Sequence, residues 1–327
     1  PETPDAALIA VPAKLVPRTL ADLGAKGCRA ATLFSSGFAE TGAEGEAAQR
    51  ELVALARKHG IRLLGPNTLG VYNAEIGYFG TFSSSLDLGF PRPGTIGIAS
   101  QSGAFGAHLS ALARQQGLGS SVLITTGNEA DITVSDAISW MVQSDRTNVI
   151  CAYMEAINDA DALLAASHTA SLTGNAVVAD AVLSQHGAIL VQDSEAMMDI
   201  AYVASRGVFP STRSLGVVTV SGGAGIVASD AAEGLGLPMP PMPDAVQKRL
   251  KDLLPYASPV NPLDCTAQAL NDPSLFEKFT SVALEEGGYG AALCFLTYVA
   301  GAPAMSEVIL KAMAPLRRDH PDRIIAL

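Results

Sequence analysis

The sequence predicts an α/β protein made of doubly wound, mainly parallel sheets. Apolar runs of strand length alternate with amphipathic or alanine-rich runs of helix length along the 327 residues, a pattern typical of parallel sheets covered by helices. Hydrophobic residues make up 48% of the chain and aromatic residues only 6%, so we expect a core of Ala, Val, Ile and Leu. Two apolar runs, near residues 95 and 215, lead through glycines directly into helical patterns.

Short apolar segments, bounded by turn residues, predict the strands. They are Ala6–Val11, Ala30–Ser35, Leu63–Leu64, Thr95–Ala99, Ser121–Thr125, Val149–Met154, Ala188–Val191, Leu215–Val220, Ala291–Leu296 and Arg323–Leu327.

Breaks in the pattern divide the chain into domains. Residues 1–74 form a partial Rossmann-like unit, 75–94 a connection rich in Gly, Ser and Pro, 95–210 a second sheet domain, and 211–327 a third. The chain begins at Pro1 rather than Met and soon enters a buried-strand pattern, and its last residues again resemble a strand. We therefore expect part of a longer polypeptide, lacking the N-terminal part of the first domain and cut near the end of the third.

Charge and cysteine content narrow the class of partner. The formal net charge is −11 and no basic run is present, which argues against nucleic-acid or membrane-surface binding. No signal peptide or transmembrane-length apolar stretch is present. The four cysteines are far apart without metal-ligand spacing, so we expect buried thiols, a cytoplasmic location and no metal site on this chain.

The first strand–glycine–helix turn, at residues 95–106, is a candidate anion site. An apolar strand ends in Ser100-Gln101-Ser102-Gly103 and turns into a helix. The unpaired N–H groups and the positive end of the helix dipole then face the carboxyl edge of the sheet. The alternative is structural, with Ser100 and Ser102 as ordinary caps and the glycines easing a tight turn.

A second turn repeats this arrangement at residues 215–228. Ser221, Gly222, Gly223 and Gly225 open the helix that follows the strand Leu215–Val220. Glycines let the backbone approach a ligand closely. We expect the two helix starts to hold one phosphate from opposite sides, because a buried dianion needs more than one set of donors.

His168 is the candidate reactive side chain. It lies in Ser167-His168-Thr169-Ala170-Ser171-Leu172-Thr173-Gly174, a polar stretch between two alanine-rich helical patterns. A neutral imidazole is a good nucleophile toward phosphoryl groups near pH 7. The sequence thus suggests a histidine that carries phosphate.

An ordered set of motifs resembles a known family along nearly the whole chain. In sequence order they are GPNTLGV at 65–71, SQSG at 100–103, GNEAD at 127–131, Glu155, SHT at 167–169, SGG at 221–223 and NPLD at 261–264. Together they resemble the NDP-forming (ADP-forming) acyl-CoA synthetases of the succinyl-CoA synthetase superfamily.

The resemblance implies both a fold and an activity. The fold would be a partial CoA-binding Rossmann-like domain followed by two flavodoxin-like doubly wound domains, with the active histidine in the first of these two. The activity would be an acid–thiol ligase that forms acyl-CoA from a carboxylic acid, CoA and ATP and releases ADP and phosphate. The intermediates would be an acyl phosphate and a phosphohistidine.

The resemblance also assigns roles to residues. His168 would carry the phosphoryl group, and Glu155 would orient the imidazole by holding its far ring N–H. The phosphate would lie between two sets of residues: Ser102, Gly103 and Ala104 on one side, and Ser221, Gly222 and Gly223 on the other. CoA would lie against Ser35, Ser36, Gly37, Gly65, Pro66, Asn67 and Thr68. Asn128, Glu129, Asn261 and Asp264 are further candidates at strand ends, with roles left open.

The chain departs from the family pattern in three places. The first strand and glycine-rich turn that hold the nucleotide part of CoA precede its start. The strand and loop that usually lead to the histidine are absent between Ser167 and His168, which points to a deletion or to a segment missing from the sequence. No ATP-grasp domain is present, so ATP, ADP and Mg²⁺ would bind to another segment or a partner subunit, and we expect a homo- or hetero-oligomer.

Other functions remain as alternatives. A non-catalytic CoA- or acyl-CoA-binding regulatory module, for example one fused to an acyltransferase, would be expected to lack a phosphorylatable histidine, and the presence of His168 with Glu155 speaks against it. A nicotinamide-dependent dehydrogenase would need a Gly-x-Gly-x-x-Gly turn, which Ser102–Gly106 does not supply. The acid itself is left open. Small aliphatic acids are the default, and Phe38, Tyr72, Tyr78, Phe79 and Phe82 leave room for a larger or aromatic one.

Overall fold

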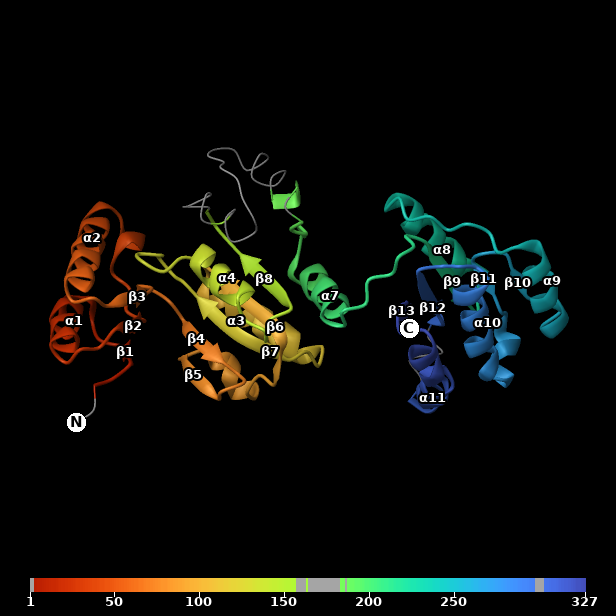
Figure 1. The fold of residues 1–327 in the computed structure, drawn as a ribbon, viewed down its shortest axis with the longest axis horizontal. Coiled ribbons are helices and arrows are strands. Elements are labelled where there is room, and N and C mark those ends of the chain that lie inside the picture. Colours follow the sequence, from red (N-terminus) through yellow and green to blue (C-terminus); the bar gives the residue numbers. More distant parts are fainter. Residues whose placement is uncertain (1–2, 157–162, 164–182, 186, 298–302) are drawn as a thin grey trace. The chain divides into compact units, whose positions relative to one another are not determined.

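The computed structural model describes residues 3–156, 163, 183–185, 187–297 and 303–327. The chain forms two compact units, Pro1–Arg206 and Gly207–Leu327. Figure 1 draws the first from red to green and the second from green to blue. Each unit is described by itself.

The first sheet of unit 1 has three parallel strands in the order β1-β2-β3. They are β1 (Ala6–Ile9), β2 (Ala30–Leu33) and β3 (Arg62–Leu64), joined by helices α1 (Val16–Ala25) and α2 (Ala43–Lys58) and the short helices η1 (Ala13–Leu15) and η2 (Ala39–Thr41). Helix α2 has two glutamates in its first turn and Arg57 and Lys58 in its last, which complements the helix dipole. Leu20, Leu33, Leu52 and Leu63 belong to the buried core between this sheet and its helices.

The second sheet of unit 1 has five strands in the order β5-β4-β7-β6-β8. They are β4 (Gly70–Asn73), β5 (Tyr78–Thr81), β6 (Pro93–Ser100), β7 (Ser120–Thr125) and β8 (Val149–Tyr153). The strands β7, β6 and β8 are parallel, whereas β4 is antiparallel to both β5 and β7. Its helices are α3 (Gly103–Gln115), α4 (Val134–Val142), α7 (Ser194–Ser205) and the short η3 (Ser84–Leu88).

Alternation along β6 and β7 explains why helices cover both faces of this sheet. Ile98 and Leu123 belong to a core shared with α3 and α7, and Ala99 and Val122 to a core shared with α4. Successive residues of a strand point to opposite faces, so each strand is apolar on both sides. This is the doubly wound arrangement that the continuous apolar runs predicted.

Three backbone hydrogen bonds join the two sheets of unit 1. The N–H groups of Asn128, Ala130 and Ile132 donate to the carbonyls of Pro66, Gly65 and Leu63 at 2.9, 3.1 and 3.1 Å. The Asp131 carboxylate adds bonds from the Arg62 side chain at 2.8 Å and the Leu63 N–H at 2.9 Å. The segment after β7 is therefore fastened to the segment after β3.

Unit 2 contains one five-stranded sheet in the order β10-β11-β9-β12-β13. The strands are β9 (Leu215–Thr219), β10 (Ser258–Pro259), β11 (Leu263–Asp264), β12 (Ala291–Phe295) and β13 (Ile324–Ala326), parallel except for β10. Its helices are α8 (Gly222–Gly234), α9 (Asp244–Leu253), α10 (Ser274–Glu285), α11 (Pro303–Asp319) and the short η4 (Ala267–Asn271). Phe276 and Phe279 are fully buried in its core.

The sheets confirm the predicted fold class. One predicted strand is not formed, and some of the observed strands were not predicted. Residues Ala188–Val191 form no strand, and Ile189 is 66% exposed, because an apolar run alone does not show that a neighbouring strand is there to pair with it. The hairpin β4–β5 was missed. None of the described helices has the length and apolar character needed to cross a membrane.

Candidate functional site

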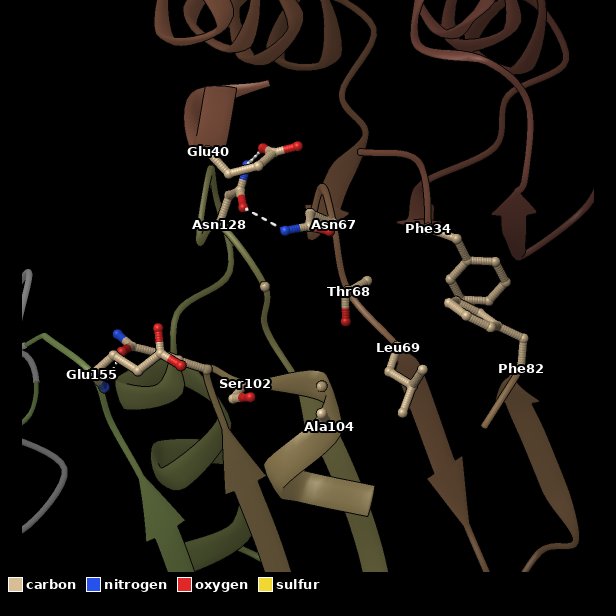
Figure 2. Close-up of a pocket in the computed structure, with 13 residues that line it drawn as sticks. Phe34, Glu40, Asn67, Thr68, Leu69, Phe82, Ser102, Ala104, Asn128 and Glu155 are labelled. Atoms are coloured by element: carbon tan, nitrogen blue, oxygen red, sulfur yellow. Dashed lines mark hydrogen bonds between the residues drawn. The ribbon is translucent and has the colours of Figure 1, made fainter. Parts of the chain in front are cut away.

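A cavity of about 400 Å³ lies in unit 1, at the carboxyl ends of several strands (Figure 2). This is the edge at which open α/β sheets bind ligands. The residues that line it are Phe34, Glu40, Asn67, Thr68, Leu69, Phe82, Gln101, Ser102, Gly103, Ala104, Gly127, Asn128 and Glu155. Seven of the residues predicted as site residues are among them: Asn67, Thr68, Ser102, Gly103, Ala104, Asn128 and Glu155.

The start of α3 forms one wall of the cavity. Ser102 is the N-cap, and its hydroxyl accepts a hydrogen bond from the Phe105 N–H at 3.3 Å. The first helical bond runs from Gly106 to the Ser102 carbonyl, so the N–H groups of Gly103 and Ala104 precede the helical ladder. The first turn contains no acidic residue. The Ser102 cap uses only the Phe105 N–H, so the N–H groups of Gly103 and Ala104 stay available. Ser102 can therefore cap the helix and lie beside a bound anion at the same time.

The predicted CoA loop forms the opposite wall, and only part of it faces the cavity. Gly65 and Pro66, joined by a cis peptide bond, are buried beneath the loop. Thr68 is 2% exposed, and its hydroxyl contacts the carbonyl and the side-chain oxygen of Thr125. Asn67 is exposed, and its backbone N–H donates to the Ser35 carbonyl at 3.0 Å. Asn67 is thus the residue of Gly65–Thr68 whose side chain is exposed at the cavity, where its amide nitrogen donates to the Asn128 side chain at 3.3 Å.

The residues Ser35, Ser36 and Gly37 follow β2 but do not line the cavity. The Ser35 hydroxyl donates to the Val11 carbonyl, and the Gly37 N–H donates to the Glu40 carboxylate. Ser36 and Gly37 are exposed. The Ser35 carbonyl holds the loop Gly65–Thr68 through its bond from the Asn67 N–H. A direct contact of Ser35, Ser36 or Gly37 with CoA stays a prediction.

Glu40 is a cavity residue that the sequence analysis missed. Its carboxylate accepts hydrogen bonds from the Phe38 N–H at 3.2 Å and from the Asn128 side chain, whose oxygen in turn accepts from Asn67 at 3.3 Å (Figure 2). Burial raises the pKa of Glu40, but the hydrogen bonds from Asn128, Gly37 and Phe38 together outweigh it and lower the pKa below 4.5. No motif marks Glu40, because its partner Asn128 is 88 residues away.

The depressed pKa of Glu40 predicts a pH dependence. The carboxylate stabilises the fold fully above pH 4.5, its ordinary value, and this contribution is lost as pH falls through the lower folded-state pKa. Glu40→Gln should therefore cost about 0.5 kcal/mol or less near pH 7, since the group is mostly exposed, and the difference from wild type should shrink in acid. Urea unfolding at several pH values measures it. The control is Glu51→Gln, which removes a carboxylate from the exposed face of α2. If the loss of stability in Glu40→Gln grew in acid, or if Glu51→Gln lost as much, the stabilising role of the Glu40 carboxylate would be contradicted.

Glu155 enters the cavity from the end of β8. It is exposed, and its backbone N–H donates to the Gln101 side chain. Glu155 and Ser102 both line the cavity (Figure 2). Glu129 does not line the cavity. Its carboxylate accepts from the Thr126 hydroxyl at 3.0 Å, the Val134 N–H at 2.7 Å and the Gln101 side chain at 2.8 Å.

The second predicted anion site lies in unit 2, at the start of α8. Ser221 is the N-cap without a side-chain capping bond, and Gly222 and Gly223 are exposed. Asp264 lies beside this helix end, because a Cβ on Gly222 would be 3.4 Å from its Oδ2 atom. An anion bound here would share the positive end of α8 with that carboxylate.

Asn261 has a structural place in unit 2. Its side-chain oxygen accepts from the Val217 N–H at 3.1 Å, and its amide nitrogen donates to the carbonyls of Leu215 and Pro240, both at 3.0 Å. Two of these bonds, with Leu215 and Val217, are made to the first half of β9, away from its carboxyl end. Asp264 rather than Asn261 lies at the carboxyl edge of this sheet, where it pairs with Thr219.

The histidine segment lies outside the described residues. This applies to Ser167, His168 and Thr169, so their geometry stays a prediction.

Within the described part of the chain no three His, Cys, Asp or Glu side chains group to hold a metal ion. The four cysteines are free and buried, and burial raises the pKa of Cys151 to about 12 and that of Cys294 to about 11. Thiols of this kind stay protonated and unreactive near neutral pH.

Comparisons with known proteins agree with the architecture. Residues 1–74 match the family model of the CoA binding domain, and residues 93–166 and 160–204 match that of the succinyl-CoA ligase like flavodoxin domain. The acetyl-coenzyme A synthetase 1 of Ca. Korarchaeum cryptofilum, solved in complex with phosphate and ADP, superimposes with a TM-score of 0.85 at 24% identity. The match covers 99% of this chain and 74% of that one, and it shows the fold.

Relatives in sequence are ADP-forming ligases. The acetate–CoA ligase (ADP-forming) I of Archaeoglobus fulgidus is 32% identical over 324 residues, which cover 91% of this chain and 46% of the relative. The acetate–CoA ligase (ADP-forming) I subunit alpha of Pyrococcus furiosus is 32% identical over 295 residues, which cover 82% of this chain and 63% of the subunit. The chain therefore spans about half to two thirds of the length of these relatives.

The two family models define the class of the protein, which joins a CoA-binding domain to a succinyl-CoA ligase like domain. The relatives are named as ADP-forming ligases, and the chain belongs, as they do, to the ADP-forming acyl-CoA synthetases of the succinyl-CoA synthetase superfamily. The resemblance drawn from the motifs is thereby confirmed.

Proposed function

We propose that the full-length protein is an acid–thiol ligase that makes acyl-CoA from a carboxylic acid, CoA and ATP. The γ-phosphoryl group of ATP passes to a ring nitrogen of His168, and ADP leaves. A carboxylate oxygen of the acid then attacks this phosphorus, the N–P bond breaks, and an acyl phosphate forms. The CoA thiolate attacks the acyl carbon, a C–S bond forms, and the C–O bond to phosphate breaks.

The cavity of unit 1 carries this proposal. It brings together the start of α3, the loop with Asn67 and Thr68, and the Glu155 side chain in one space of about 400 Å³. The open N–H groups of Gly103 and Ala104 and the positive end of α3 suit a phosphoryl group there. A thiol held by the loop and a phosphoryl group at the helix would then be neighbours, as the last step requires.

The remaining roles follow from family membership. Glu155 holds the far ring N–H of His168, fixes its tautomer and stabilises the imidazolium during transfer. Ser221, Gly222 and Gly223 supply the second set of phosphate donors. We assign residues 1–74 to the CoA-binding domain, 95–210 to the histidine-bearing flavodoxin-like domain and 211–327 to the second such domain. Residues 75–94, which contain β5 and η3, connect the first two.

The nucleotide half of the reaction belongs to another part of the protein or to a partner. The Pyrococcus relative is named as a subunit alpha, and the match covers only 46% of the Archaeoglobus relative. We propose an ATP-grasp domain or subunit that binds ATP and Mg²⁺, in a homo- or hetero-oligomer. The free, buried cysteines fit a reducing, cytoplasmic setting.

The acid is proposed to be small and aliphatic. Of the aromatic residues that left a larger acid open, Tyr72 and Phe38 are buried in the cores, and only Phe82 lines the cavity. Phe82 packs edge-to-face against Phe34, with ring centroids 5.0 Å apart. A panel of acids assayed by ADP release tests this proposal, and a strong preference for aryl acids would contradict it.

Labelling of the histidine tests the proposed function. Full-length protein incubated with γ-labelled ATP, and with the partner subunit where that is separate, should acquire acid-labile, base-stable label. The label should disappear in His168→Ala and remain in His108→Ala, because His108 lies on α3 and contacts Ser194 at 3.1 Å. Label that persists in His168→Ala would overturn the assignment. A wild-type protein that binds CoA but never becomes labelled would indicate the regulatory module instead.

A further inference from the structure

Gln101 occupies the centre of the hydrogen-bond network beneath the cavity. It follows β6, is 9% exposed and lines the cavity. Its side-chain oxygen accepts from the N–H groups of Glu155 and of Ala156, the latter at 3.0 Å. Its side-chain nitrogen donates to the Ala156 carbonyl at 2.7 Å and to the Glu129 carboxylate at 2.8 Å. The carboxamide thereby uses both donors and both lone pairs.

Glu129 anchors the other end of this network. Its carboxylate is held by the Thr126 hydroxyl and by the Val134 N–H at the start of α4. The Gln101 backbone is held between the neighbouring strands as well, by the Tyr153 carbonyl at 3.0 Å and the Gly127 N–H at 3.1 Å. The Gln101 side chain therefore rests on two firmly placed strand ends, β6 and β7.

Glu155 needs such a support because it lies beyond the sheet. The ladder between β6 and β8 ends with the pair Ser100 and Tyr153, and Glu155 is exposed two residues further on. Its backbone N–H donates to the oxygen of the Gln101 carboxamide. We propose that Gln101 is the positioning residue for Glu155: it fixes the backbone after β8 so that the carboxylate meets the histidine. This inference rests on the proposed function.

The chemistry of the network explains why a glutamine is required. A glutamate at position 101 would place a second carboxylate against Glu129 and against the Ala156 carbonyl, and like charges and unpaired acceptors repel. Lysine or arginine could not accept the two N–H groups. A partner exchange is possible, however. In Gln101→Glu/Glu129→Gln the new amide at 129 can donate to the new carboxylate at 101, which still accepts from the N–H groups of residues 155 and 156. The exchange removes the repulsion between the two carboxylates, and the repulsion from the Ala156 carbonyl remains.

The test combines activity with a measurement of the backbone. In full-length protein, Gln101→Met should lower the rate of histidine labelling and kcat roughly 10- to 100-fold, the range for partners that orient a catalytic group, with the KM for CoA changed less than about threefold. Amide hydrogen exchange of the peptide covering residues 153–156 should accelerate at least tenfold. Gln116→Met is the matched control, because Gln116 is exposed and its side chain bonds to Asp199 at 3.3 Å. It should change none of these.

Rescue separates positioning from general structure. Gln101→Glu should slow labelling as Gln101→Met does, and the double variant Gln101→Glu/Glu129→Gln should regain part of this loss, because the repulsion between the two carboxylates is removed. Normal labelling in Gln101→Met, unchanged exchange at 153–156, or a double variant no better than Gln101→Glu would overturn the assignment. If wild-type protein is not labelled at all, the proposed function fails, and unchanged exchange would still refute the support of Glu155 by Gln101.

Discussion

Replacing Glu155 by glutamine is expected to lower kcat roughly 10²- to 10⁴-fold, the range seen when a group that assists proton transfer at a histidine is lost. The substitution keeps the size of the side chain and leaves the backbone bond from residue 155 to Gln101 intact. A neutral amide, however, stabilises an imidazolium poorly and can hold the ring in the wrong tautomer. Steady-state kinetics of acyl-CoA formation, together with the rate of histidine labelling, measures the effect.

The control for Glu155→Gln is Glu51→Gln, which removes a carboxylate from an exposed position on α2. It should keep the activity of wild type. The KM for CoA should stay within about threefold in both variants. A Glu155→Gln enzyme that works within about threefold of the wild-type rate would show that this carboxylate does not assist the histidine.

Gly127→Ala is expected to weaken CoA binding strongly. The Gly127 φ is 60°, and an added Cβ would lie 2.4 Å from the Pro66 carbonyl oxygen and 2.7 Å from the Asn67 carbonyl carbon. Both contacts are with backbone, so the loop itself must move. Overpacking of this kind costs about 1–3 kcal/mol, which corresponds to roughly a 5- to 150-fold loss in CoA affinity if it falls on the bound state. Calorimetric titration with CoA measures this loss.

The matched control for Gly127→Ala is Gly117→Ala. Gly117 has a similar φ of 71° in the same unit, but nothing lies within 4 Å of its added Cβ. Both variants meet the backbone strain of an alanine at positive φ, about 1–2 kcal/mol, and only the first meets a collision. Equal CoA affinity in the two variants would show that the approach of Gly127 to the loop does not matter for binding.

The sequence predicted those parts of the fold and the site that depend on local patterns. The run from Thr95 to Gly106 predicted a strand followed by a helix start, and the structure places β6, the N-cap Ser102 and α3 there. Local chemistry decides such a turn, because a serine cap and an N-terminal glycine act within a few residues. The same holds for α8 after β9.

Features that depend on partners distant in sequence were missed. The strand β4 begins at Gly70 with a φ of 106° and pairs in antiparallel fashion with β7, which no run of apolar residues indicates. Gln101 was noticed only as part of a motif, because its partners Glu129 and Ala156 are 28 and 55 residues away. The apolar run at Ala188–Val191 predicts a strand that the structure does not contain. The hydrophobicity of a run does not show whether a neighbouring strand is there to pair with it.

The fastening of Asn128, Ala130 and Ile132 to Leu63, Gly65 and Pro66 has a consequence for how this family can diverge. The link consists of main-chain groups, so substitutions whose side chains do not collide with this backbone leave its hydrogen bonds in place. The loop that contains Asn67 and the segment after β7 that contains Asn128 thus keep a constant spacing, while the side chains of the surrounding cavity wall can vary. Substitution of wall residues such as Phe82 would then alter the shape of the cavity without changing that spacing, and under the proposed function these are the positions where the preference for the acid would change.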